Sequence, residues 1–172
     1  MAISDLLKKQ IANATPPGGG VYLKDGIYML AIKKIELDTK KYTGTCFICE
    51  FKIVSAKPHP RYPDVIPNAE GTSASIVWNF TKHADTAPGN TKGFLATLEG
   101  VDASTLDAET VGTLIDAAVS KEQPYKGYLV GCETYRKMTK KGDKELTLPR
   151  WQHVPEVGEN SPEMIKERAA SL

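Results

Sequence analysis

Two cysteines three positions apart, Cys46 and Cys49, are the residues whose spacing first suggests chemistry in this chain. A Cys-x-x-Cys pair can bind zinc or carry out thiol–disulfide exchange. Here the pair lies in an apolar stretch with the pattern of a β-strand, and residues three apart on a strand point to opposite faces. No second pair follows, and Cys132 and the three histidines are scattered along the chain. We therefore predict buried, reduced thiols, with no metal ion and no cofactor.

Patterns typical of enzymes are not found in the rest of the sequence. It contains no G-x-S-x-G, no phosphate-binding P-loop and no H-E-x-x-H. The three glycines at 18–20 follow two prolines rather than a strand, which is typical of a linker. No two carboxylates are set together among apolar residues, as general acid–base catalysis would require. We expect that the protein is not an enzyme, unless residues distant in the sequence converge.

Basic and aromatic side chains occur together in three segments, 33–47, 78–83 and 133–151. Single-stranded nucleic acid is bound by cations that contact phosphates and by rings that stack on bases, at roughly 1–3 kcal/mol per stacked base. These segments therefore supply the candidate binding residues. The candidate DNA-binding residues are Lys33, Lys34, Lys40, Lys41, Tyr42, Trp78, Tyr135, Arg136, Lys137, Lys140, Lys141, Lys144, Arg150 and Trp151.

Each of these segments also has an interpretation without a ligand. A lysine-rich turn such as Lys40-Lys41 is commonly solvated, and lysines protect sheet edges from aggregation. Trp78 and Phe80 are two positions apart, so on a strand they share a face and could belong to the core. Tyr135 and Trp151 have polar neighbours, which favours partial exposure for them.

The composition limits the classes of function. The chain of 172 residues has 22 Lys and Arg against 21 Asp and Glu, so any electrostatic binding surface must come from local clustering. A hydrophobic content of 41% is enough for a core without a metal or disulfide. The sequence has an odd number of cysteines, no signal-peptide pattern and no apolar run of about 20 residues. We therefore predict a soluble protein in the cytoplasm of a bacterial host cell, with no membrane partner.

Five segments have strand patterns, at residues 26–37, 45–55, 72–80, 125–138 and 145–154. Helical spacing is clearest over 107–119, with one or two further turns at 94–98, and 57–71 and 81–91 are expected loops. A helix between the third and fourth of five antiparallel strands is the OB-fold arrangement. We predict a mainly-β fold, an OB-fold-like five-stranded antiparallel barrel with that helix inserted; another α+β domain with the same element order is the alternative.

The expected domain organisation has three parts. Residues 1–20 are expected to form a flexible N-terminal arm with a short helix, ended by two prolines and three glycines. Residues 21–155 are expected to form the OB-like domain. Residues 156–172 form a polar C-terminal tail with helical potential from 161 to 170.

The segments 26–32, 78–80, 94–98 and 125–130, in this order, resemble bacteriophage-type single-stranded DNA-binding proteins with an OB fold. The resemblance covers residues 22–155. It implies cooperative coating of single-stranded DNA in DNA replication or recombination, with replication or recombination proteins as partners and with self-association into a homo-oligomer. Such proteins often carry an acidic C-terminal tail. This chain departs from that pattern because Lys166 and Arg168 interrupt the acidic residues of its tail.

The leading hypothesis is therefore sequence-tolerant binding of single-stranded DNA through phosphate contacts and base stacking. A protein-interaction or virion-assembly module without nucleic-acid binding is the alternative, suggested by the near-zero net charge and the two terminal arms. An enzyme acting on nucleic acid is a third and less supported hypothesis.

Overall fold

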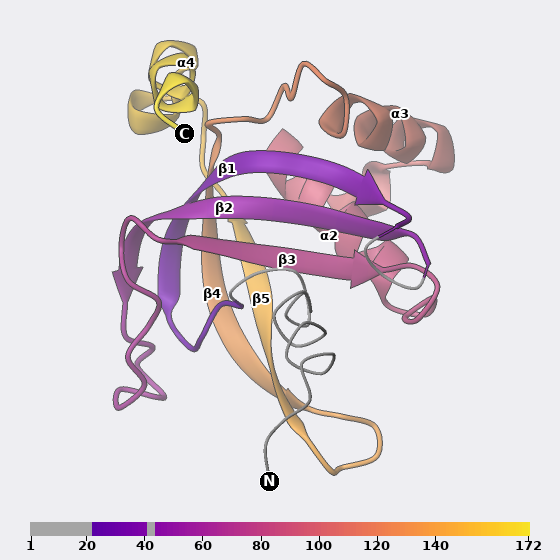
Figure 1. Cartoon of the computed structure of the whole chain (residues 1–172), viewed down its shortest axis with the longest axis vertical. Coiled ribbons are helices and arrows are strands. Elements are labelled where there is room, and N and C mark those ends of the chain that lie inside the picture. The colour runs from indigo at the N-terminus through magenta and orange to yellow at the C-terminus, as the bar shows by residue number, and fades with distance from the viewer. Residues whose placement is uncertain (1–21, 41–43) are drawn as a thin grey trace, which may run out of the picture.

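Five segments with alternating apolar side chains form one antiparallel sheet in the order β3-β2-β1-β4-β5 (Figure 1). The computed structural model describes residues 22–40 and 44–172. The expected N-terminal arm and the candidates Lys41 and Tyr42 lie outside the described residues. The strands are β1 (Ile27–Asp38), β2 (Cys46–Lys57), β3 (Ser73–Asn79), β4 (Leu129–Met138) and β5 (Glu145–His153). All five were predicted, although β4 begins four residues later than its apolar pattern indicated.

The sheet is open, and the prediction of a closed barrel is wrong in this respect. β1 pairs with β2 along its whole length, but it pairs with β4 only through Ile27–Ala31. β4 begins opposite Ala31 and passes the start of β1 at Glu133, and the rest of the β4–β5 hairpin continues beyond the layer of β1, β2 and β3, which the hairpin crosses behind (Figure 1). β3 and β5 are consequently the two edges of the sheet, and no ladder joins them in the described residues. Pro149 also removes one main-chain donor from β5.

Three α-helices are described, and the first of them is longer than the sequence indicated. They are α2 (Ala87–Glu99), α3 (Ala108–Ala118) and α4 (Pro162–Ala170), with short 3-10 turns η1 (Ala103–Thr105) and η2 (Gly158–Asn160). The expected loop over 81–91 is wrong from Ala87 onward, because Pro88 occupies the first turn of α2, where a missing N–H costs nothing. Asp107 caps α3, accepting from the Thr110 N–H at 2.7 Å.

The C-terminal segment is attached to the sheet by its own helix. Ser161 caps α4, and Ile165 of that helix is buried. Asn160 accepts a hydrogen bond from the Leu129 N–H at 2.9 Å, at the start of β4. The Arg168 guanidinium donates to the Gly127 carbonyl at 2.6 Å. The helical potential of this tail is therefore confirmed, and α4 packs where β4 begins.

Aromatic rings from the sheet and from α2 form the centre of the core. Phe94 of α2 packs edge-on against Phe47 and Phe51 of β2, with centroid separations of 6.3 and 6.0 Å. Trp78 is 8% exposed and stacks on Phe47 at 5.8 Å. Trp151 is half-buried and lies 4.8 Å from Phe94. Trp78 therefore belongs mainly to the core, whereas Trp151 lies at its boundary.

The cysteines are buried in this core. Cys46, Cys49 and Cys132 are all unpaired thiols with at most 1% of their surface exposed. Burial raises the pKa of the Cys132 thiol to about 12 and raises the pKa of Cys49 as well. The prediction of buried thiols is confirmed.

The described residues lack a candidate metal site and a membrane-spanning helix. In residues 22–40 and 44–172, no three His, Cys, Asp or Glu side chains are grouped so that they could hold a metal ion. None of the helices in the same residues is both long enough and apolar enough to cross a membrane.

Candidate nucleic-acid interface

A groove of about 490 Å³ lies between the two free edges of the sheet. One wall is made by residues 75–79 on β3, and the other by residues 146–149 on β5. His83, Thr86 and Asn90, which come after β3, add polar groups to it. We call this the edge groove. Its walls are mainly apolar because Ile76 and Trp78 face it from β3 and Leu146 and Leu148 from β5.

The segment that leads into β1 also lines the edge groove. Tyr22 and Leu23 lie there, and the buried side chain of Asn68 fixes them in place. Asn68 donates from Nδ2 to the Tyr22 carbonyl at 3.0 Å and accepts from the Lys24 N–H at 2.8 Å. The proline-rich loop between β2 and β3 thus determines where the chain enters the groove.

A smaller pocket of about 170 Å³ continues from the edge groove toward α2. We call it the aromatic pocket, because Trp78, Tyr135 and Trp151 line it. Gly89, Asn90 and Gly93 of α2 and Leu148 and Pro149 of β5 complete it. The Arg150 guanidinium carbon lies 5.2 Å from the centroid of the Tyr135 ring. The two cavities share four residues and form one continuous surface; the shared residues are Trp78, Asn90, Leu148 and Pro149.

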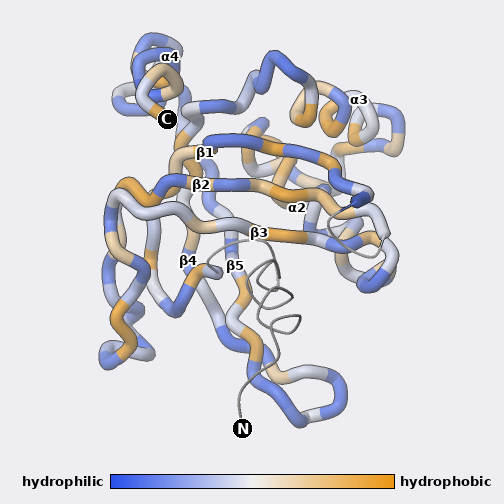
Figure 2. Tube along the Cα trace, viewed as in Figure 1, coloured by the Kyte–Doolittle hydropathy of each residue, from blue (hydrophilic) through white to orange (hydrophobic). Residues whose placement is uncertain are grey.

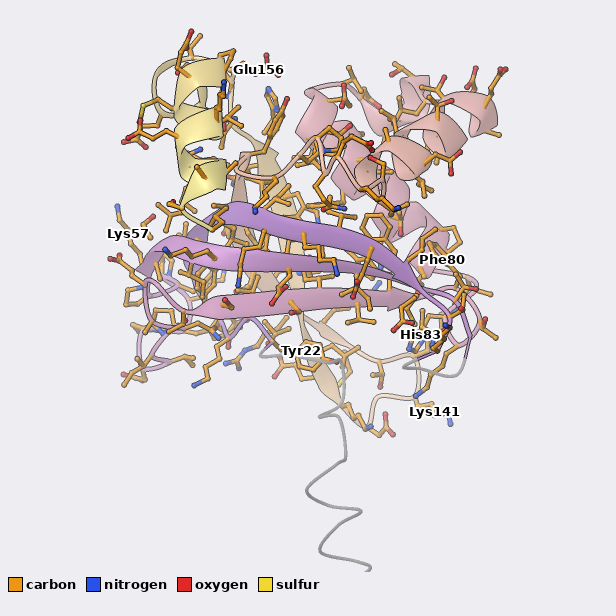
Figure 3. All side chains as sticks on the ribbon, turned by 45° about the horizontal axis from the view of Figure 1, so that its top comes forward. Tyr22, Lys57, Phe80, His83, Lys141 and Glu156 are labelled. Atoms are coloured by element: carbon orange, nitrogen blue, oxygen red, sulfur yellow. The ribbon has the colours of Figure 1, made fainter. Side chains whose placement is uncertain are left out.

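Three loops that are far apart in the sequence meet at one end of the edge groove. The Phe80 N–H donates to the Thr45 carbonyl at 2.9 Å, which joins the loop after β3 to the β1–β2 loop. Lys140 Nζ lies 3.5 Å from Asp85 Oδ2, which joins the loop after β3 to the β4–β5 turn. Figure 3 shows Phe80, His83 and Lys141 at the same end of the sheet, with Lys57 at the other. The turn of the β4–β5 hairpin is strongly hydrophilic (Figure 2).

Several candidate cations are paired with carboxylates on the protein itself. Lys33 lies 3.8 Å from Glu50 and also donates to Ser73 at 3.1 Å. Lys34 lies 2.7 Å from Glu36, and this hydrogen bond raises the pKa of the lysine. These pairs leave Lys33 and Lys34 less able to bind an anion.

Arg136 has a structural environment that its sequence neighbours did not indicate. Its guanidinium donates to buried Asp25 at 2.7 and 3.1 Å and lies 3.5 Å from Glu145. It also covers the ring of Tyr62 at 3.7 Å from the centroid. Asp25 raises the pKa of the guanidinium further. Arg136 thus ties the start of β1 to the β4–β5 hairpin.

The remaining candidate cations are exposed to solvent. Lys137, Lys141 and Lys144 make no ion pair within the part of the chain that the structure describes, and Lys140 contacts only exposed Asp85. The Lys40 side chain is likewise exposed in the β1–β2 loop, where its N–H donates to Asp38 at 2.8 Å. The structure therefore brings lysines of the first and third sequence segments to the same end of the molecule.

Sequence reasoning missed the contribution of α2 to this surface. Gly89 and Asn90 fall in the loop that the sequence predicts over 81–91, and Gly93 has no predicted role, yet all three form one side of the aromatic pocket. The apolar side chains of Phe94, Leu95 and Leu98, together with the small Ala87, would have been the available signal for a helix starting earlier. Leu146 and Leu148 were assigned to a strand but not to a site.

Comparison with known proteins adds no relative. No protein-family model, no curated protein and no solved structure matches this chain.

Proposed function

We propose that this protein binds single-stranded DNA without sequence preference, through the lysine-bearing loops and the edge groove beside them. The observation that carries the proposal is the meeting of three loops at one end of a mainly apolar groove, and their described residues are 39–40 with 44–45, 80–86 and 139–144. Exposed lysines there suit a phosphate backbone, and the half-buried rings of Tyr135 and Trp151 suit bases.

An OB-type fold is the second part of the proposal. OB folds are five-stranded and partly open barrels that bind oligonucleotides with the loops joining strands 1–2 and 4–5. An open five-stranded sheet, with helices between β3 and β4 and with lysines in both of those loops, fits that description. We propose on the same basis a role in DNA replication or recombination, in a bacteriophage setting and in the cytoplasm of the host, with proteins of those processes as partners and without catalytic turnover.

A single strand fits this surface better than a duplex does. In a duplex the bases are stacked inside, so only phosphates and groove edges are presented to a protein. The edge groove instead has apolar walls, and only unpaired bases that can turn outward would contact these walls and exclude water from them. Binding should therefore weaken on duplex DNA of the same length.

A fluorescence polarisation titration with labelled oligo-dT tests the proposal. The wild type should bind at micromolar protein or below, with affinity that falls as salt rises, and the same titration with oligo-U and with duplex establishes the preferred nucleic acid. The variant Lys140→Ala/Lys141→Ala/Lys144→Ala should bind more weakly. The matched control is Lys57→Ala/Lys121→Ala/Lys166→Ala, since these three lysines are exposed but lie outside the groove and its loops. Absence of salt-sensitive binding by the wild type would refute the proposal.

The apolar character of the edge groove supports a second candidate, a protein-interaction or virion-assembly module. Two unpaired strand edges with apolar side chains between them can accept an extended peptide by strand addition. A defined complex with a protein or with a second copy, seen by native mass spectrometry and unchanged by added oligonucleotide, would favour this candidate over DNA binding.

A further inference from the structure

We infer that the aromatic pocket holds one nucleobase of the bound strand; this inference rests on the proposed function and assigns the place of a base within it. Its lining combines three aromatic rings with the glycine-rich face of α2. Trp78 and Trp151 meet there at right angles, with centroids 6.4 Å apart. A flat aromatic ligand could contact Tyr135 and Trp151, which are both half-buried and so have ring surface left to cover.

The side of the pocket made by α2 is empty because two helical positions there have no side chain. Gly89 and Gly93 both line the pocket, and a Cβ added at either would meet no heavy atom within 4 Å. Glycine in a helix is less stable than alanine by about 1 kcal/mol. These two glycines thus reduce the stability of α2 and leave room beside the rings. Asn90 lies between them, and its exposed amide can both donate to and accept from the edge of any base.

The charge around the pocket favours a nucleobase over an apolar side chain of a protein partner. Arg150 lies over the Tyr135 ring, and exposed Lys137 and Lys144 are on the same hairpin. A base in the pocket brings with it a phosphate on either side, and these cations would meet those phosphates. An apolar peptide would gain nothing from them.

The two tryptophans make the pocket directly observable. The chain has only two, Trp78 and Trp151, and both line the aromatic pocket. Intrinsic fluorescence should therefore be quenched when oligo-dT binds. An abasic oligonucleotide of equal length has the same phosphates without bases, so it should bind more weakly and cause little quenching.

Filling the pocket separates this inference from the proposed function. Gly93→Leu, or Gly89→Leu as a second variant, should fill the space beside the rings, since a Cβ at either position has no heavy atom within 4 Å. Each should lower affinity for oligo-dT roughly tenfold, the loss of about one stacked base. The matched control is Gly112→Leu on α3, a helical glycine that also has nothing within 4 Å of its Cβ position. It should bind and quench as the wild type does.

Each outcome decides one of the two statements. If Gly93→Leu and Gly89→Leu bind oligo-dT with wild-type affinity and quenching, the pocket does not hold a base, although DNA binding stands. Equal binding and equal quenching by dT and abasic oligonucleotides would overturn the inference in the same way. If the wild type binds no oligonucleotide, the proposed function itself fails.

Discussion

Removal of exposed lysines from the β4–β5 hairpin should reduce the salt dependence of DNA binding in steps. Four lysines of this hairpin, Lys137, Lys140, Lys141 and Lys144, are exposed, and only Lys140 has an acidic partner among the described residues. For single strands, the slope of log affinity against log salt is roughly 0.7 per phosphate contact. If each of the four meets one phosphate, the hairpin contributes a slope of roughly 3, and raising salt from 50 to 200 mM costs about fiftyfold in affinity.

The measurement is a set of polarisation titrations with labelled oligo-dT at four salt concentrations. Lys141→Ala and Lys144→Ala should each lower the slope by roughly 0.7, and the double variant should lower it by about twice as much. Lys57→Ala is the control, because Lys57 is exposed at the opposite end of the sheet (Figure 3). Our placement of the phosphates is refuted if the double variant keeps the wild-type slope, or if Lys57→Ala changes it equally.

Three further predictions concern the framework that holds the site. Asn68→Ala removes two side-chain hydrogen bonds to the segment before β1 and one to Tyr28 of β1, and it should cost about 2–3 kcal/mol in urea unfolding. The exposed Asn90→Ala should change stability by less than about 0.5 kcal/mol. Gly127 has a φ of +88°, and Gly127→Ala would place a Cβ against the backbone of α4, so amide hydrogen exchange in α4 should become faster. The control is Gly142→Ala, at a φ of +70° in an open turn, which should lower the free energy of unfolding by only about 1 kcal/mol. Burial raises the pKa of the Cys132 thiol from 9.0 to about 12, so the thiol of the unfolded chain loses its proton at lower pH than that of the folded protein. The contribution of this thiol to the free energy of unfolding should therefore be fully present below pH 9 and be lost between pH 9 and 12. Cys132→Ala should weaken this loss of stability, and an equal loss in the variant would contradict the prediction.

The strands could be predicted because their signal is local. Alternation of apolar residues located all five within a few residues, since one face of each strand must meet the core. The sheet closure could not be predicted in the same way. It depends on whether β3 and β5 approach closely enough to exchange hydrogen bonds. They remain separate edges in the described residues, and β4 pairs with β1 only through Leu129–Glu133.

Helix α2 shows how local signals can also mislead. Pro88 and Gly89 each reduce helix propensity, and together with their polar neighbours they indicate a loop over 81–91. The buried faces of Phe94, Leu95 and Leu98 outweigh that preference, because tertiary packing supplies most of the stability of a short helix.

Partners distant in the sequence decided which cations are available to a ligand. Arg136 and Asp25 are 111 positions apart, and nothing in the local pattern of the hairpin indicated that this arginine pairs with a buried carboxylate. Lys33 is likewise a DNA-binding candidate by residue type, but Glu50 lies beside it in the structure, 3.8 Å away. Residue type and local clustering therefore located the positive surface, but only the fold separates the exposed lysines from those already paired.

Near-zero net charge is compatible with a polyanion as ligand when the charges are segregated. Residues 135–150 contain six Lys and Arg against two Asp and Glu, whereas residues 99–126 contain two against six, and residues 156–172 contain two against four. Glu156 and Lys141 lie at opposite sides of the molecule in Figure 3, and α3 and α4 lie far from the β4–β5 turn in Figure 1. An approaching strand would meet the local potential and not the sum, since charges more than about 10 Å away are largely screened at 0.1 M salt. The acidic side would also repel a strand that approached there. The average composition of this chain therefore conceals a positive end, and the near-zero total is compatible with the binding face that we propose there.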